Sequence, residues 1–109
     1  MSASKAKGTA AETAVVRFLQ ANGHPGAERR ALAGAQDRGD VAGIPGVVIE
    51  VKDCQRMELA AWMNELARET PVGELGVVWH KRRGHTLPGA WYVTMTGATF
   101  VALLEGWTE

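Results

Sequence analysis

The alternation of side chains in VVIEVK, residues 47–52, constrains the fold of this chain more than any other feature. Every second residue from Val47 onward is Val or Ile, whereas the opposite face ends in Glu50 and Lys52. This period of two predicts a β-strand with one apolar face. Gly-Ile-Pro-Gly at 43–46 predicts a turn, and a partner strand begins near Asp40, so the whole segment is predicted to form a β-hairpin.

This hairpin brings two carboxylates together. Folding it symmetrically about Pro45 sets Asp40 opposite Glu50, with Cβ atoms about 5 Å apart, which destabilises a sheet unless a cation or a proton separates the charges. Carboxylate oxygens are hard ligands, which favours Mg²⁺ or Mn²⁺ over zinc. Asp37 is an alternative to Asp40; we favour Asp40 because Val41 follows it into the strand.

Lys52 lies on the same face as Glu50. An ammonium group there could hold or deprotonate an attacking water, or neutralise charge on a phosphate, while a metal ion acts as a Lewis acid. This combination predicts hydrolysis of phosphodiester bonds in nucleic acid. The alternative is that Asp40 flanks a turn, and that Glu50 and Lys52 lie on an exposed strand face.

Asp40 followed by Glu50-Val51-Lys52 resembles the signature of the PD-(D/E)XK nuclease superfamily. Together with three other features, it makes residues 8–104 similar to small Holliday junction resolvases, especially those encoded by bacteriophages. These features are Glu12, the pair Arg29 and Arg30, and the segment GVVWHKRRG.

The resemblance implies a metal-dependent DNA endonuclease that cuts four-way junctions as a homodimer. It implies Mg²⁺, with Mn²⁺ as a substitute, held by Asp40, Glu50 and the main-chain carbonyl of Val51. Lys52 and Glu12 would be the other catalytic residues. The chain departs from the family in lacking a Pro before Asp40. The auxiliary polar residue of many such nucleases has only two candidates, Gln55 and Asn64.

Glu12 has a second interpretation. Thr-Ala-Ala-Glu at 9–12 matches a capping box, in which Thr9 caps a helix and Glu12 reaches back to the cap amide. Apolar residues at helical spacing follow, and Asn22-Gly23 predicts the end of the helix. Both roles of Glu12 remain open from the sequence.

The remaining pattern predicts an α/β domain with a central mixed β-sheet flanked by helices. The predicted order is a helix from Thr9, a three-strand meander, a crossover helix, two strands and a terminal helix. The resemblance implies a restriction-endonuclease-like fold with an αβββαβ core. The expected elements after the first helix are strands at 27–32, from residue 40 and at 47–52, a helix at 55–69, strands at 74–80 and 91–96, and a helix at 99–104.

Basic residues gather in two places. Arg29 and Arg30 precede the hairpin, and Lys81, Arg82 and Arg83 follow the strand at 74–80. Each group is either ordinary solvated charge or a set of phosphate contacts. The formal net charge is zero, so contact with DNA must depend on local clusters and not on the global field.

Further features concern the setting of the domain. Residues 1–7 are predicted to be a flexible basic tail, and residues 8–109 a single nuclease domain. One cysteine, Cys54, excludes an internal disulfide, and no apolar run reaches the length of a membrane span. We therefore expect a cytoplasmic protein without a membrane partner, in the host cell cytoplasm if a phage encodes it.

Two other functions compete with the resolvase prediction. One is a related nuclease that acts on linear or damaged duplex DNA. The other is a noncatalytic DNA-binding or assembly module with an idle site. A homodimer interface could come from the helix that carries Trp62 or from the segment between Trp91 and Trp107.

Overall fold

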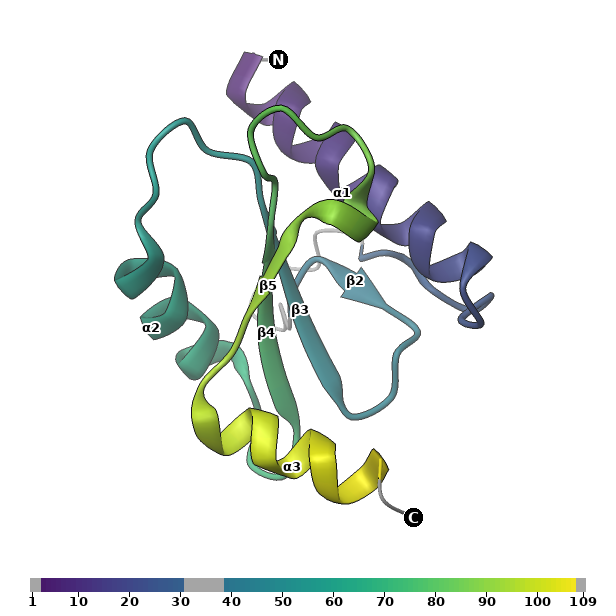
Figure 1. Cartoon of the computed structure of the whole chain (residues 1–109), viewed down its shortest axis with the longest axis vertical. Helices are drawn as coiled ribbons and strands as arrows, with labels where there is room; N and C mark the ends of the chain where they lie inside the picture. Colours follow the sequence, from purple (N-terminus) through teal and green to yellow (C-terminus); the bar gives the residue numbers. More distant parts are fainter. Residues whose placement is uncertain (1–2, 31–38, 108–109) are drawn as a thin grey trace.

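A central sheet is covered by helices on both faces. The computed structural model describes residues 3–30 and 39–107, and within them the chain is α/β, as predicted. Its helices are α1 (Ala3–Ala21), α2 (Leu59–Glu69) and α3 (Gly97–Trp107); its strands are β1 (Glu28–Arg29), β2 (Val41–Ala42), β3 (Val47–Lys52), β4 (Leu75–His80) and β5 (Tyr92–Thr94); and a 3-10 turn, η2, spans Pro88–Ala90. Figure 1 shows α1 and α2 on opposite sides of the sheet, with α3 across one end.

The main sheet has the order β3-β4-β5 and is mixed, as predicted. β3 runs parallel to β4, with Glu50 beside Val78 and Lys52 beside His80, while β5 is antiparallel to β4. The helix α2 makes the crossover between the two parallel strands. This arrangement brings the end of β3, which carries Glu50 and Lys52, next to the end of β4.

The predicted three-strand meander is wrong. β1 and β2 form a separate antiparallel pair, with Arg29 opposite Val41. Just before β2, the chain contacts β3 through one main-chain hydrogen bond. The Asp40 amide donates to the Ile49 carbonyl at 2.8 Å. The side chain of Asp40 then accepts a bond from the Val51 amide, so a carboxylate takes the place of a partner strand's carbonyl at this edge of β3.

Both faces of β3 are buried, although one apolar face was predicted. The face of Ile49 and Val51 packs against α1, mainly at Val15 and Val16. On the opposite face, Val48 and Val78 pack against α2, through the residues Trp62 and Leu66. Because α2 covers the face that carries the charges, Glu50 becomes a buried carboxyl, 5% exposed.

The helix α1 begins before the predicted capping box. It includes residues 3–7, which were predicted to be a tail, and the Thr13 hydroxyl donates to the Thr9 carbonyl inside the helix. Ala and Lys are strong helix formers, which explains why the helix includes ASKAK, residues 3–7, despite Gly8. Thr9 is thus not the N-cap. The predicted end at Asn22-Gly23 is confirmed, because Gly23 has a positive φ just after the helix.

Other boundaries shift in the second half of the chain. The helix α2 begins at Leu59 and not at residue 55, which leaves 53–58 as a loop. β5 ends at Thr94, and the Thr96 hydroxyl accepts a bond from the Thr99 amide and caps a longer α3. Within residues 3–30 and 39–107, none of the helices combines the length and hydropathy of a membrane span. Asp37 and the end of the predicted first strand, at 31–32, lie outside the described residues.

Candidate active site

Gly39 allows Asp40 to approach β3. Its φ is +80°, and a Cβ atom there would lie 2.6 Å from the main-chain oxygen of Ile49. Only glycine fits this close approach without strain. The chain can therefore place an Asp40 carboxylate oxygen 2.7 Å from the Val51 amide, directly beside Glu50.

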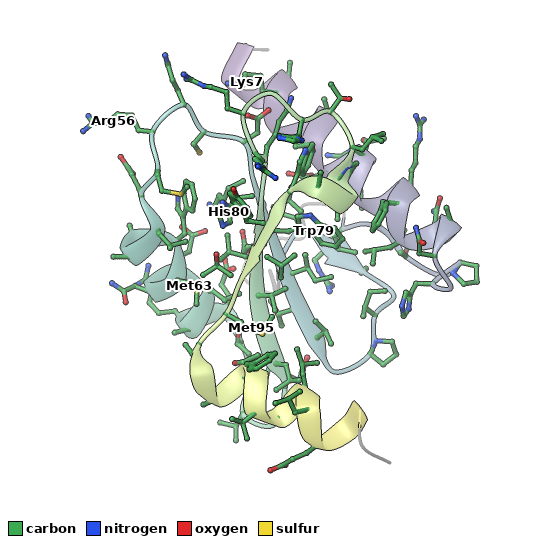
Figure 2. All side chains as sticks on the ribbon, in the orientation of Figure 1. Lys7, Arg56, Met63, Trp79, His80 and Met95 are labelled. Carbon is green, nitrogen blue, oxygen red and sulfur yellow. The ribbon has the colours of Figure 1, made fainter. Side chains whose placement is uncertain are left out.

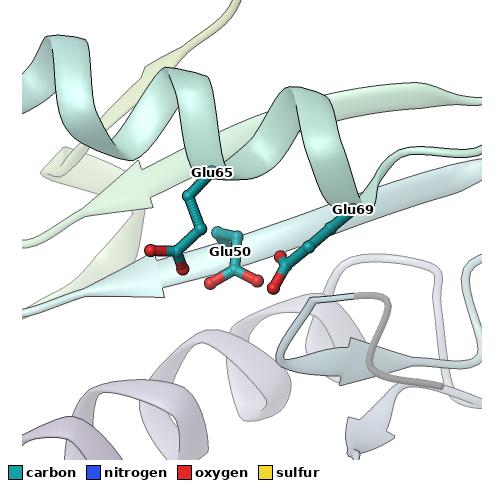
Figure 3. Close-up of side chains that lie close together, drawn as sticks. All are labelled: Glu50, Glu65 and Glu69. Atoms are coloured by element: carbon teal, nitrogen blue, oxygen red, sulfur yellow. The ribbon is translucent and has the colours of Figure 1, made fainter. Parts of the chain in front are cut away.

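Glu50 meets two carboxyls that the sequence analysis did not identify. Glu65 and Glu69 come from α2, and one oxygen of each lies within 4.8 Å of the others and of a Glu50 oxygen. Figure 3 shows the three side chains converging from β3 and α2. One signal was available: Glu65 and Glu69 flank Leu66 in the helical stripe that begins at Trp62, so they border whatever α2 buries.

The two central carboxyls hold protons more tightly than usual. Burial raises the pKa of Glu50 to about 10, with help from a hydrogen bond to Glu69 and from the negative charges of Asp40 and Glu69. Burial also raises the pKa of Asp40, assisted by Glu12, although the bond from the Val51 amide acts in the opposite direction. In addition, a buried oxygen of Glu69, Oε2, has no hydrogen-bond partner among the described residues. This cluster is thus short of positive charge.

Lys52 stays protonated at neutral pH. Burial lowers the pKa of Lys52, but the charges of Glu65 and Glu50 outweigh it, so the net pKa is raised. The Lys52 ammonium lies 3.3 Å from a Glu65 carboxylate oxygen, and its side chain is partly buried. Of the roles considered for Lys52, holding a water or neutralising a phosphate fits this environment, whereas deprotonating a water does not.

Glu12 and Arg29 form an ion pair above this cluster. The Arg29 guanidinium donates to one Glu12 oxygen from both Nε and Nη2, at 3.2 and 3.1 Å. The capping role of Glu12 is excluded because α1 begins at Ala3. Arg30 comes directly after β1, where its amide donates to the Asp40 carbonyl, and its buried Nε has no hydrogen-bond partner in the described part of the chain.

These residues line one cleft of about 410 Å³, which we call the acidic cleft. It brings together five predicted site residues, Glu12, Asp40, Glu50, Val51 and Lys52, with the two predicted DNA contacts Arg29 and Arg30. Glu65 and Glu69 complete its wall. The main-chain N–H and C=O of one strand residue point to the same edge, so the Val51 carbonyl faces the side on which Asp40 lies.

The other predicted residues line a second pocket of about 530 Å³, which we call the basic pocket. Lys81, Arg82 and Arg83 form part of its rim, and Gln55 lies there too, outside the lining of the acidic cleft. Asn64, the other candidate for the auxiliary group, is exposed and lines neither cavity. Glu65 and Glu69 occupy the place on α2 where an auxiliary group was expected.

Comparisons with protein-family models, with curated proteins and with solved structures returned no match to this chain.

Proposed function

We propose that this protein is a metal-dependent DNA endonuclease of the PD-(D/E)XK type, with a restriction-endonuclease-like core, that cuts four-way junctions. The observation that carries the proposal is the convergence of Asp40, Glu50 and Lys52 on one cleft. Two carboxylates, a strand carbonyl and an ammonium group are the components that this chemistry requires.

The acidic cleft fits a divalent cation. The pKa of Glu50 is far above that of an ordinary carboxyl group because Glu50 is buried beside other carboxyls. The buried Oε2 of Glu69 has no hydrogen-bond partner among the described residues. Both features are relieved when a cation binds, and hard oxygen donors are what Mg²⁺ and Mn²⁺ prefer. Asp40, Glu50 and the Val51 carbonyl would hold the ion; Glu69 borders the same space through its contact with Glu50.

The residues around this position have separate roles. A bound Mg²⁺ would supply Lewis-acid activation of the scissile phosphodiester and of the attacking water. Lys52 would hold that water and stabilise charge on the phosphate, since its ammonium persists at neutral pH. Glu65 orients Lys52 through their ion pair, and Glu12 fixes the guanidinium of Arg29 at the rim, where it can meet the DNA backbone.

The basic tip of Lys81, Arg82 and Arg83 would contact phosphates on one side of the cleaved bond. Replacing all three residues by Ala is expected to reduce the slope of log binding constant against log salt by about 2 to 3, because each lost phosphate contact removes about 0.9. A salt titration of DNA binding measures this slope. A control that removes two positive charges elsewhere is Arg17→Ala with Arg68→Ala, at exposed arginines that line neither cavity; its slope should stay at the wild-type value. An unchanged slope in the triple variant would mean that the basic tip is a solvated turn that does not contact phosphates.

A second copy of the chain is the partner that resolution of a junction requires. The chain has a single set of Asp40, Glu50 and Lys52, whereas resolution needs two cuts in symmetry-related strands, which a two-fold dimer provides. Trp62 and Trp91 are both 7% exposed and belong to the core. The helix α3 instead presents Phe100, Leu103 and Leu104 at helical spacing, each at least 40% exposed, so we place the interface on α3.

Cleavage of a labelled four-way junction tests the function and the assembly together. Wild-type protein with Mg²⁺ should make paired cuts, and an excess of Glu50→Gln chains should convert these into single nicks because mixed dimers have one working cleft. Phe100→Glu with Leu104→Glu should give a monomer by sedimentation, whereas Leu87→Glu, at an exposed apolar position just before η2, should not.

The outcomes separate the competing functions. If the protein cleaved junction and linear duplex at equal rates, or if the wild type stayed monomeric on a junction, it would be a simpler duplex nuclease and not a resolvase. Binding of DNA without cleavage of junction, flap or duplex in Mg²⁺ would leave a noncatalytic DNA-binding module.

A further inference from the structure

The basic pocket differs in charge from the acidic cleft beside it. Its described lining includes the cations Lys7, Lys52, Lys81, Arg82 and Arg83, but Asp53 is its only carboxylate. Asp53 pairs with Lys7 and Lys81, at 3.7 and 3.8 Å, and so gathers them at one side of the pocket. In a chain of zero net charge, this is a concentrated positive surface with a volume in the range of about 300–1,000 Å³ of small-molecule sites.

Aromatic rings form the inner wall of the basic pocket. The His80 ring lies between Trp62 and Tyr92, with centroid distances of 5.6 and 5.8 Å. Figure 2 shows His80 on the α2 side of the sheet and Trp79 on the other. Met57 adds an exposed thioether to the lining, and Tyr92 is half exposed. The wall therefore has flat and polarisable groups that a ligand can reach.

Two details show which chemistry this wall can accept. The Arg82 guanidinium lies over the Tyr92 ring at 5.1 Å, so one planar cation already stacks there. His80 is 4% exposed, its Nε2 bonds to the Thr94 hydroxyl at 2.7 Å, and its buried Nδ1 has no partner among the described residues. A planar ligand with polar edges could stack on the ring wall and satisfy His80, whereas an inorganic anion would use the cations alone.

The basic pocket adjoins the proposed site of cleavage. Lys52 lines both cavities, so a group in the basic pocket lies next to the ammonium that would contact the scissile phosphate. Lys52 is the residue that the two linings share, and it pairs with His80 where β3 and β4 end side by side. The two cavities are therefore neighbours, and one DNA strand is the kind of ligand that could occupy both.

We propose that the basic pocket holds an unpaired nucleotide of the DNA substrate, with its base against Tyr92 and Met57 and its phosphate on Lys81, Arg82 and Arg83. This inference rests on the proposed nuclease function and names the feature that the enzyme selects. A base inside a duplex is not free to enter such a pocket, whereas one at a branch or in a single-stranded extension is. The pocket therefore selects branched DNA over continuous duplex.

Binding of extended duplexes tests the basic pocket without relying on cleavage. One duplex carries a short unpaired extension with 2-aminopurine next to the junction with the paired region, and a second carries an abasic nucleotide at that position. Ca²⁺ replaces Mg²⁺ so that the DNA stays intact. Wild-type protein should quench the 2-aminopurine emission and bind the abasic DNA roughly 5- to 100-fold more weakly, as loss of one stacked base implies.

Variants in the ring wall complete the test as a double-mutant cycle. Tyr92→Ala should bind both DNAs with the weaker affinity, and Tyr92→Phe, which restores the ring, should recover the preference for the intact base. The neighbouring Val93→Ala, outside the lining of the pocket, should behave as wild type. Met57→Ala, at a position 61% exposed, provides a second variant that leaves the core intact and should lose part of the preference.

Equal wild-type affinity for the intact and abasic extensions, with unchanged emission, would overturn the nucleotide pocket and leave a backbone contact only. That result is distinct from failure of the nuclease proposal, which shows as absence of cleavage in Mg²⁺. If the base stacked in the basic pocket but no DNA were cleaved in Mg²⁺, the nucleotide pocket would stand and the nuclease proposal would be rejected.

Discussion

Asp40→Asn should lose cleavage by on the order of 10³-fold in kcat, because removal of one metal ligand forfeits several kcal/mol of transition-state charge stabilisation. The Asn side chain keeps the size of Asp and can still accept the bond from the Val51 amide, so the local fold should persist. DNA binding depends on the basic residues and should change little. Single-turnover cleavage of a labelled junction, combined with a binding assay in Ca²⁺, separates the two effects.

The matched control removes a carboxylate elsewhere. Glu58→Gln makes the same change of charge at an exposed residue before α2 that lines neither cavity. It should cleave at the wild-type rate. If Asp40→Asn also cleaved at that rate in Mg²⁺, Asp40 would not be a metal ligand.

Glu50→Gln should stabilise the metal-free protein, and the gain should grow with pH. The folded pKa of Glu50 is about 10, against 4.5 in the unfolded chain, so between these values the unfolded state loses the proton that the folded state keeps. Stability from this group is complete below pH 4.5 and falls as pH rises. Burial is the main cause of the raised pKa of Glu50; Glu69 and Asp40 add to it, and Lys52 opposes it.

Gln carries no titrating proton, so the difference between variant and wild type isolates Glu50 from other groups such as His80, whose pKa burial lowers. In chelator, the variant's advantage in the free energy of unfolding should be small at pH 5 and about 4 kcal/mol larger at pH 8, because each pH unit between the two pKa values changes it by about 1.4 kcal/mol. Urea unfolding at the two pH values measures it. A variant less stable than wild type at pH 8 would contradict the raised pKa of Glu50 in the folded protein.

The core of the site was predictable from local pattern alone. The period of two in residues 47–52 places Glu50 and Lys52 on one face, and the turn at 43–46 returns Asp40 to them. The structure keeps that proximity although β2 pairs with β1 and not with β3. The reason is that a side-chain bond to the Val51 amide achieves the approach that strand pairing was expected to give.

The contribution of α2 depends on tertiary packing and was missed for that reason. A strand face that ends in Glu50 and Lys52 is typical of a solvent-exposed surface, so nothing local indicated that Trp62 and Leu66 would cover it. Once α2 lies there, Glu65 and Glu69 necessarily meet Glu50. The beginning of α1 was mispredicted for another reason. Thr9 was expected to cap the helix, but the residues before it have a high helix propensity and extend the helix to Ala3.

The central claim is that the acidic cleft cleaves DNA with a bound divalent ion, and one assay on the wild-type protein tests it most directly. A labelled four-way junction is incubated with the protein in chelator, then with Mg²⁺ in excess of the chelator, while the products are followed in time. No cleavage in chelator, followed by strand cleavage once Mg²⁺ is free, is the result that we expect. Cleavage that continues in chelator, or an intact junction in excess Mg²⁺, would contradict the claim.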